Sequence, residues 1–228
     1  MENPVSNKVL KEITEKTQAA FKSYSERTYK NTLRNLIGIF NNLYYIDKNN
    51  NSVNLKCFHA NQERAIARVT TGDNITLPVL TISETESSND DARRRYSPIL
   101  VHDKFWDEDK RRSIRLLSLS PKPINISYQI NIWAKYKEDL DQIRENIFIL
   151  FNPDLELPLK NNNINKAFLV SESDGSEIDV PDQKDRVLRK SIIINVESYI
   201  PSPKFLYTST GKIEQFLYDI EIDESLNQ

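Results

Sequence analysis

Hydrophobic and polar residues alternate most regularly between residues 124 and 136. Apolar side chains occupy every second position there, at Ile124, Ile126, Tyr128, Ile130, Ile132 and Ala134. A period of two predicts a long strand with one buried face. The pattern then changes to Leu140, Ile143 and Ile147, a helical spacing that predicts a helix from about residue 137 to Asn152-Pro153.

The same two periodicities predict the other main elements. A helix is expected over residues 28–41, because apolar positions recur at i, i+3, i+4 and i+7. Strands are expected at residues 43–47 and 52–59, which flank an asparagine-rich turn, and at residues 76–85, 187–200 and 216–222. Strands interleaved with two good helices indicate an α+β protein: a mixed, mostly antiparallel sheet packed against two main helices, with extended arms.

The chain divides into a core and three less apolar segments. We expect residues 1–27 to form a helical or flexible N-terminal arm, residues 28–203 to form the α+β core, and residues 204–228 to form a C-terminal β-arm. Residues 84–122 are rich in charge and interrupt the core as a long insertion loop. Loops of that length in compact domains are commonly functional or disordered.

Composition removes most catalytic classes. The four glycines lie more than thirty residues apart, which excludes the glycine-rich nucleotide-binding motifs and the nucleophile elbow. One cysteine and two distant histidines leave no thiolate metal knuckle or HExxH pattern. Most familiar enzyme signatures are therefore excluded, and composition alone offers no catalytic, metal or cofactor residue.

Charge and hydropathy indicate the environment. The net charge of −2 argues against a nucleic-acid binder, which usually carries a basic excess. The apolar runs are too short to span a membrane, and the start of the chain lacks the apolar stretch of a secretion signal. The expectation is a soluble protein made in the cytosol.

Two basic clusters in the insertion loop are candidate contact residues for a neighbouring subunit or a partner. They are Arg93, Arg94 and Arg95, and Lys110, Arg111 and Arg112, with Trp106 as an anchor between them. Nearby aspartates and glutamates offset their charge, so a solvated loop is the plain alternative. Binding to DNA is a third possibility.

Phe216 and Tyr218 are further contact candidates, on the last predicted strand. This strand either stays in its own sheet or adds to the edge of a neighbour's sheet. Trp133 lies on the polar face of the best strand. Either another element covers it or it marks an interface.

The order of these features resembles the tail sheath stabiliser, or tail completion (tail terminator), neck protein family of T4-like contractile-tailed bacteriophages. The resemblance covers about residues 28–222 and rests on an ordered set of segments rather than on one motif. The segments are Leu36 to Phe40, Leu43 to Asp47, Val53 to Leu55, Glu63 to Arg68, Leu77-Pro78, an arginine among Arg93 to Arg95, Pro123 to Lys135, Asp139 to Pro153, and Asp185-Arg186 leading to Tyr199-Ile200-Pro201. The N-terminal arm and the low glycine content depart from the family pattern.

The resemblance implies a structural role in the virion and no catalytic residues. Such proteins form a hexameric ring at the head-proximal end of the tail, where they terminate tube and sheath polymerisation, stabilise the sheath and provide a docking surface for the head. The implied partners are the protein itself, the tail tube and sheath proteins and the head-neck connector proteins, with no membrane, and with DNA only passing through the ring channel. The implied location is the phage tail or neck, after synthesis in the host cytoplasm.

Two other functions stay open. One is the cap of a phage-related contractile injection system. The weaker one is an uncharacterised hydrolase that uses a carboxylate pair such as Asp139 and Asp141, or Asp219 and Glu221. Both pairs have structural explanations, since the first lies at a helix start and the second on the wet face of a strand.

Overall fold

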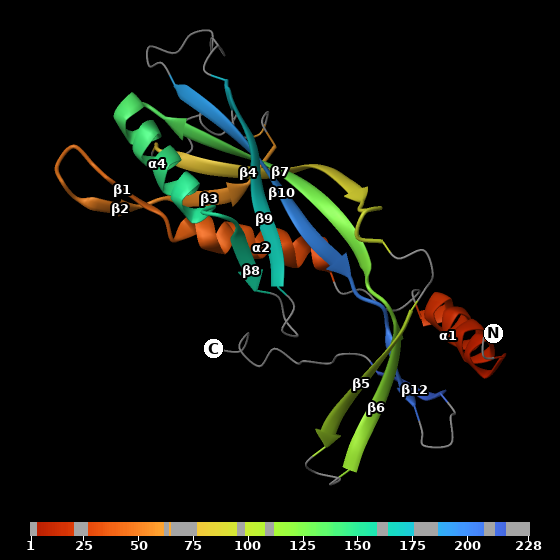
Figure 1. The fold of residues 1–228 in the computed structure, drawn as a ribbon. Helices are drawn as coiled ribbons and strands as arrows, with labels where there is room; N and C mark the ends of the chain where they lie inside the picture. The colour runs from red at the N-terminus through yellow and green to blue at the C-terminus, as the bar shows by residue number, and fades with distance from the viewer. Residues whose placement is uncertain are drawn as a thin grey trace. The chain divides into compact units, whose positions relative to one another are not determined.

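The computed structural model describes residues 4–20, 27–61, 64, 77–94, 99–107, 112–158, 164–175, 187–207 and 213–217. The chain forms two compact units (Figure 1). Unit 1 contains residues 1–26, 91–123 and 199–228, and unit 2 contains residues 27–90 and 124–198. The fold is α+β, as the periodicities predict, with mostly antiparallel sheets.

Unit 2 is built on a six-stranded sheet in the order β3-β4-β7-β10-β9-β8, with a separate β1-β2 hairpin. Strands β3 and β4 are parallel, whereas β4–β7, β10–β9 and β8–β9 are antiparallel. The elements are α2 (Thr28–Asn41), β1 (Tyr44–Ile46), β2 (Ser52–Asn54), β3 (Lys56–His59), β4 (Val79–Asn89), β7 (Lys122–Ala134), α4 (Lys137–Leu150), β8 (Leu155–Pro158), β9 (Ile164–Asp174) and β10 (Leu188–Ile200).

Both helices of unit 2 lie on the same face of this sheet. In α2, Thr32 is 3.5 Å from the Asn165 amide, which also donates to Ser198 on β10. In α4, Arg144 forms an ion pair with Glu172, whose register partner on β10 is Ile192. Ser198 and Ile192 are an even number of residues apart, so they point to one face of β10. The sides of α2 and α4 away from this face are therefore available to solvent.

The strand and helix with the clearest patterns are confirmed. Strand β7 buries every apolar residue of the alternating run, and α4 buries Leu140, Ile143 and Ile147. The expectation of a wet second face on β7 is wrong for its last third, where Asn131 and Trp133 are also buried. Trp133 packs with Val79 and Ala60 and donates to Thr81 at 3.0 Å, so covering residues explain its burial.

The segment that we expected to be an insertion loop, residues 84–122, contains strands. Strand β4 continues to Asn89, paired with Ile124 on β7, although its last six residues are all exposed. Further on, β5 (Leu100–Asp107) and β6 (Arg112–Leu119) form an antiparallel hairpin. The end of β4 is exposed on both faces, and β6 buries the successive residues Leu116 and Leu117, so neither has the period of two by which a sequence reveals a strand.

Unit 1 gathers this hairpin with both chain ends. Its sheet has the order β12-β11-β6-β5, where β11 is Lys204–Tyr207 and β12 is Ile213–Leu217. Helix α1 (Pro4–Ala20) contributes Ile13, which packs with Leu117 and Phe205 in a small buried core. Unit 1 therefore combines parts of the N-terminal arm, the insertion loop and the C-terminal arm around its own small core. Within the N-terminal arm, the structure describes α1.

Candidate interaction surfaces

The β1–β2 hairpin is fixed to α4 by side-chain amides. Gln142 accepts a hydrogen bond from the Ile46 N–H at 3.1 Å and donates to the Ile46 carbonyl at 3.4 Å. One helical turn further on, Asn146 donates to the Tyr44 carbonyl at 2.9 Å. The two amides therefore satisfy the backbone of β1 on the edge that β2 does not pair, as the neighbour of an edge strand must.

Anchoring the hairpin leaves two large apolar side chains exposed. Strand β1 has three bulky residues in succession, and Tyr45 is the one that faces inward. Tyr44 and Ile46 must then point the other way, where they are 55% and 48% exposed. We call this pair the hairpin surface. Exposed apolar residues that gather on one element are typical of protein contact sites.

Helix α4 adds exposed apolar residues at its C-terminal end. Ile149 is 71% exposed and Phe148 is 40% exposed. Neither belongs to the buried stripe of the helix, which consists of Leu140, Ile143 and Ile147. An isoleucine so open to solvent contributes little to the core of unit 2, and its side chain is available for a contact outside the subunit.

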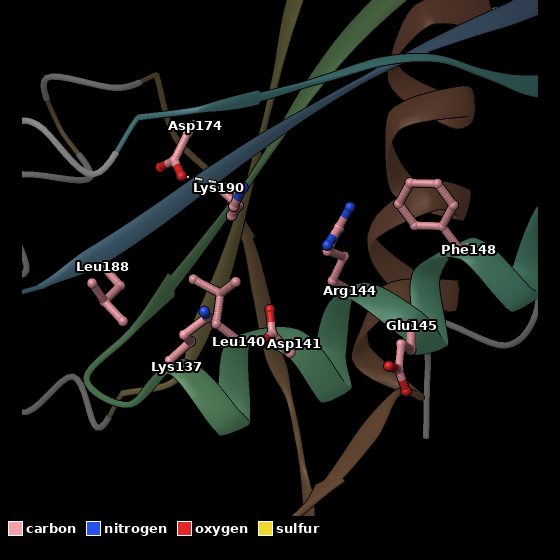
Figure 2. A pocket seen from close by; sticks show the side chains of 9 residues that line it. All are labelled: Lys137, Leu140, Asp141, Arg144, Glu145, Phe148, Asp174, Leu188 and Lys190. Atoms are coloured by element: carbon pink, nitrogen blue, oxygen red, sulfur yellow. Dashed lines mark ion pairs between the residues drawn. The ribbon is translucent and has the colours of Figure 1, made fainter.

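A groove of about 730 Å³ lies between α4 and the neighbouring ends of β9 and β10 (Figure 2). Its lining mixes apolar side chains with three cations and three carboxylates: Leu140, Phe148, Leu188, Lys137, Arg144, Lys190, Asp141, Glu145 and Asp174. Figure 2 shows Arg144 and Glu145 leaving α4 on opposite sides.

Ion pairs neutralise the sheet side of the groove. Arg144 is 2.7 Å from Glu172, and Lys190 is 3.2 Å from Asp174. These partners hold the side chains against the sheet. The Arg144–Glu172 pair connects α4 to β9, and the Lys190–Asp174 pair connects β10 to β9. The groove therefore has no excess of one charge that would bind a small charged substrate.

Asp139 is the buried acid of this region. Although it lies in the first turn of α4, it is only 7% exposed. Burial raises the pKa of its carboxyl group, and the nearby Asp47 raises it further, whereas Lys48 acts in the opposite direction. Asp141, two residues on, lines the groove. The carboxylate pair considered for hydrolysis therefore divides between a buried and a groove position, and the Asp219/Glu221 pair lies outside the described residues.

The raised pKa of Asp139 leads to a pH-dependent prediction. A carboxyl group whose pKa is higher in the folded than in the unfolded state favours folding below its unfolded pKa, and that contribution is lost as the pH rises through the folded pKa. We expect Asp139→Asn to stabilise the protein at pH 7 and to change its stability less at pH 4. Urea unfolding at both pH values measures this. An equal effect at both pH values would contradict the assignment.

The structure describes five of the nine predicted contact residues. Arg93 and Arg94 follow β4, and the Arg93 guanidinium lies 5.0 Å from the centre of the Tyr199 ring. Trp106 is opposite Ser113 in the β5–β6 hairpin, Arg112 is opposite Asp107, and Phe216 is opposite Phe205. All five belong to unit 1.

The remaining four candidates, Arg95, Lys110, Arg111 and Tyr218, lie outside the described residues. Of the final predicted strand, the described part pairs with β11 of the same chain. That pairing corresponds to the reading in which the strand stays in its own sheet.

Sequence reasoning missed the hairpin surface and Ile149. Both had a readable signal. Three consecutive bulky residues on a strand, Tyr44-Tyr45-Ile46, cannot all face one core. Ile149 falls two positions after Ile147, so it leaves the helical stripe.

Other site types find no support in the described ranges. Within them, no group of three His, Cys, Asp or Glu side chains lies close enough to hold a metal ion. Of the helices that the structure describes, none has the length and apolar character to cross a membrane.

The described chain is a two-unit α+β protein with apolar side chains exposed on a hairpin and a helix. Comparison with known families is specific. Residues 23–227 match the family described as T4-like virus Myoviridae tail sheath stabiliser. The chain belongs to this family, so it is a structural protein of the phage tail, associated with tail proteins in the virion. No curated protein matches the chain.

Proposed function

We propose that this protein forms a ring, with six copies, at the head-proximal end of a contractile phage tail. The ring ends the polymerisation of tube and sheath, holds the last sheath ring in place and provides the surface on which the neck of the head docks. The protein acts by geometry and performs no chemistry.

The observation that carries this proposal is the family match, which covers both compact units rather than one of them. A protein that stabilises a tail sheath needs to bind a repeating assembly at its end. A closed ring does this with one type of subunit, because each copy offers the same surfaces around the axis.

The exposed apolar side chains support self-association. Tyr44 and Ile46 on β1 and Ile149 on α4 are solvated in the single chain, and a subunit contact would remove them from water. The basic residues Arg93, Arg94 and Arg112 of unit 1 are proposed to contact acidic surfaces of neighbouring subunits or tail proteins. Arg95, Lys110, Arg111, Trp106, Phe216 and Tyr218 extend this proposed contact set.

Reconstitution on tails tests the proposal. The purified full-length protein is analysed by sedimentation velocity, alone and after mixing with tube–sheath assemblies that lack neck proteins, and the mixtures are imaged by electron microscopy. We expect a collar of six copies at one end of each assembly and a sheath that resists premature contraction.

A chain that stays monomeric with tails present would overturn the ring. Binding along the whole length of the sheath, rather than at one end, would overturn the terminator role. Hydrolysis of a small molecule at a site in the groove of Figure 2 would instead favour the enzyme alternative.

A further inference from the structure

The solvent side of α2 carries a short basic stripe that ends in a glycine. Lys30, Arg34 and Gly38 are spaced four residues apart, so they lie one above the other on the helix, and all three are exposed. Helix α2 contains no acidic residue. Within the described parts of the chain, neither Lys30 nor Arg34 forms an ion pair.

No neighbouring atom that the structure describes requires a glycine at position 38. It lies in the last turn of α2, as the fourth residue from its C-terminal end, and a methyl group built at its Cα would meet no atom within 4 Å. Glycine destabilises a helix interior relative to alanine, because the unfolded chain loses more backbone freedom on folding. A glycine that the subunit does not need is explained by the close approach of another molecule.

Helix α4 carries the complementary stripe at the same spacing. Asp141, Glu145 and Ile149 are also four residues apart; Asp141 is half-buried, Glu145 and Ile149 are exposed, and both carboxylates also line the groove beside α4. Neither carboxylate takes part in an ion pair with any residue that the structure describes, and Glu145 leaves the helix on the side opposite to Arg144 (Figure 2). Ile149 is the most exposed large apolar side chain among the described residues.

We infer that α2 of one copy packs parallel to α4 of a second copy of this chain. In that alignment Lys30 faces Asp141, Arg34 faces Glu145, and the Ile149 side chain enters the space that Gly38 leaves open. Glycine at this position allows the two helix axes to approach closely, and the isoleucine fills the gap. The inference rests on the proposed ring, for which it names the subunit contact.

The alignment is specific in direction. An antiparallel arrangement centred on Arg34 and Glu145 would place Lys30 against Ile149 and Gly38 against Asp141, which satisfies neither end. The contact also joins two different surfaces of the chain. Each copy therefore contacts one neighbour through α2 and another through α4, which is the condition for a head-to-tail ring.

Charge reversal with rescue tests the pairing. Arg34→Glu alone and Glu145→Arg alone should each weaken assembly by about tenfold or more, because each places like charges in contact. The double variant, or an equimolar mixture of the two single variants, should recover assembly. Glu86→Arg, the reversal of an exposed charge on β4 that takes no part in the proposed pairing, is the control and should assemble like the wild type. Copies per tail end and sedimentation velocity report assembly.

Gly38→Ala separates an interface role from a folding role. Alanine is the better helix former, so the free subunit should melt at a higher temperature than the wild type. Ring assembly should nevertheless weaken, because the added methyl group occupies the space for Ile149.

Since the proposed ion pairs are exposed, assembly should also weaken as the salt concentration is raised from about 0.1 M to about 1 M, because the electrostatic screening length falls from about 10 Å to about 3 Å.

The outcomes distinguish this contact from the ring itself. A wild-type ring that none of the α2 and α4 variants disturbs overturns the helix pairing and leaves the proposed function in place. Loss of tail attachment with intact self-association assigns the α2 surface to a tail protein and also overturns the pairing. A wild-type chain that is monomeric alone and on tails overturns both.

Discussion

Ile13→Ala is expected to lower the stability of unit 1 by about 2–5 kcal/mol. Ile13 is fully buried, and it packs with Leu117 of β6 and Phe205 of β11. A small core offers few neighbours that can move to fill the space left by the removed methyl and methylene groups. Hydrogen exchange should therefore rise in β5, β6 and β11, while β7 and β10 within unit 2 keep their protection.

A matched control lies on the same helix. Glu15 is exposed two residues after Ile13, so Glu15→Ala should change stability by less than about 0.5 kcal/mol. If Ile13→Ala raised exchange equally in every strand of the chain, the two cores would belong to one cooperative unit. If it raised exchange nowhere, α1 would not be part of the core.

This experiment also determines what α1 contributes. The family match begins at residue 23, after the last residue of α1 at Ala20. The helix nonetheless supplies one of three buried residues to the core of unit 1. Its packing therefore makes it an integral element of that unit, whatever its role in other members of the family.

The best patterned elements could be predicted because packing and periodicity agree there. Helix α2 has the predicted bounds, Thr28–Asn41, since Leu36 and Phe40 both bury on one side. Strand β10 follows the alternation of Ile192, Ile194 and Val196 in the same way. Intrinsic secondary-structure preference, the spacing of apolar side chains and the packing of the folded core all favour the same secondary structure at these positions.

Unit 1 could not be predicted because its elements are far apart in sequence and poorly patterned. Strands β5 and β6 need β11 to form a sheet and α1 to cover it. Leu117 becomes buried, and Leu119 partly buried, only after these segments meet. A single segment does not contain that information, so the hairpin had the charge content of a loop.

The candidate contact residues also differ in how far the sequence alone reveals them. The sequence draws attention to clustered arginines, because charge runs are visible without a fold. Gly38 and Ile149 gain meaning only when the exposed sides of α2 and α4 are known. An isolated glycine or isoleucine in a sequence can have many roles, and knowing that its side-chain position is exposed to solvent excludes a role in core packing.

A buried polar network explains why the second face of β7 is not wet. The Asn131 side-chain oxygen accepts from Gln129 at 3.0 Å, from Ser191 at 2.7 Å and from Arg189 at 3.0 and 3.3 Å. Arg189 is 6% exposed, and its guanidinium lies 5.2 Å from the centre of the Trp133 ring. Its side chain also runs 3.3 Å from where a Cβ on Gly175 would be, so a larger residue there would press against the Arg189 side chain.

Asn131→Ala is expected to be among the most damaging single changes in unit 2, at about 3–5 kcal/mol. Alanine removes the oxygen shared by three side chains, one of which is a buried guanidinium. Burial already lowers the pKa of Arg189, which reflects the cost of holding its charge away from water. Urea unfolding of the full chain measures the loss.

The nature of the substituent separates lost hydrogen bonding from lost volume. Asn131→Asp keeps the shared oxygen and adds a negative charge beside Arg189, so it should lose much less stability than Asn131→Ala near pH 7 and should lose more as the carboxylate is protonated in acid. In the Arg189→Met background, Asn131→Ala should cost less than in the wild type, because the buried charge that needs the oxygen has gone. Equal losses for alanine and aspartate, or an unchanged cost in the methionine background, would show that packing around Asn131, rather than its hydrogen bonds to Arg189, maintains this face of the sheet.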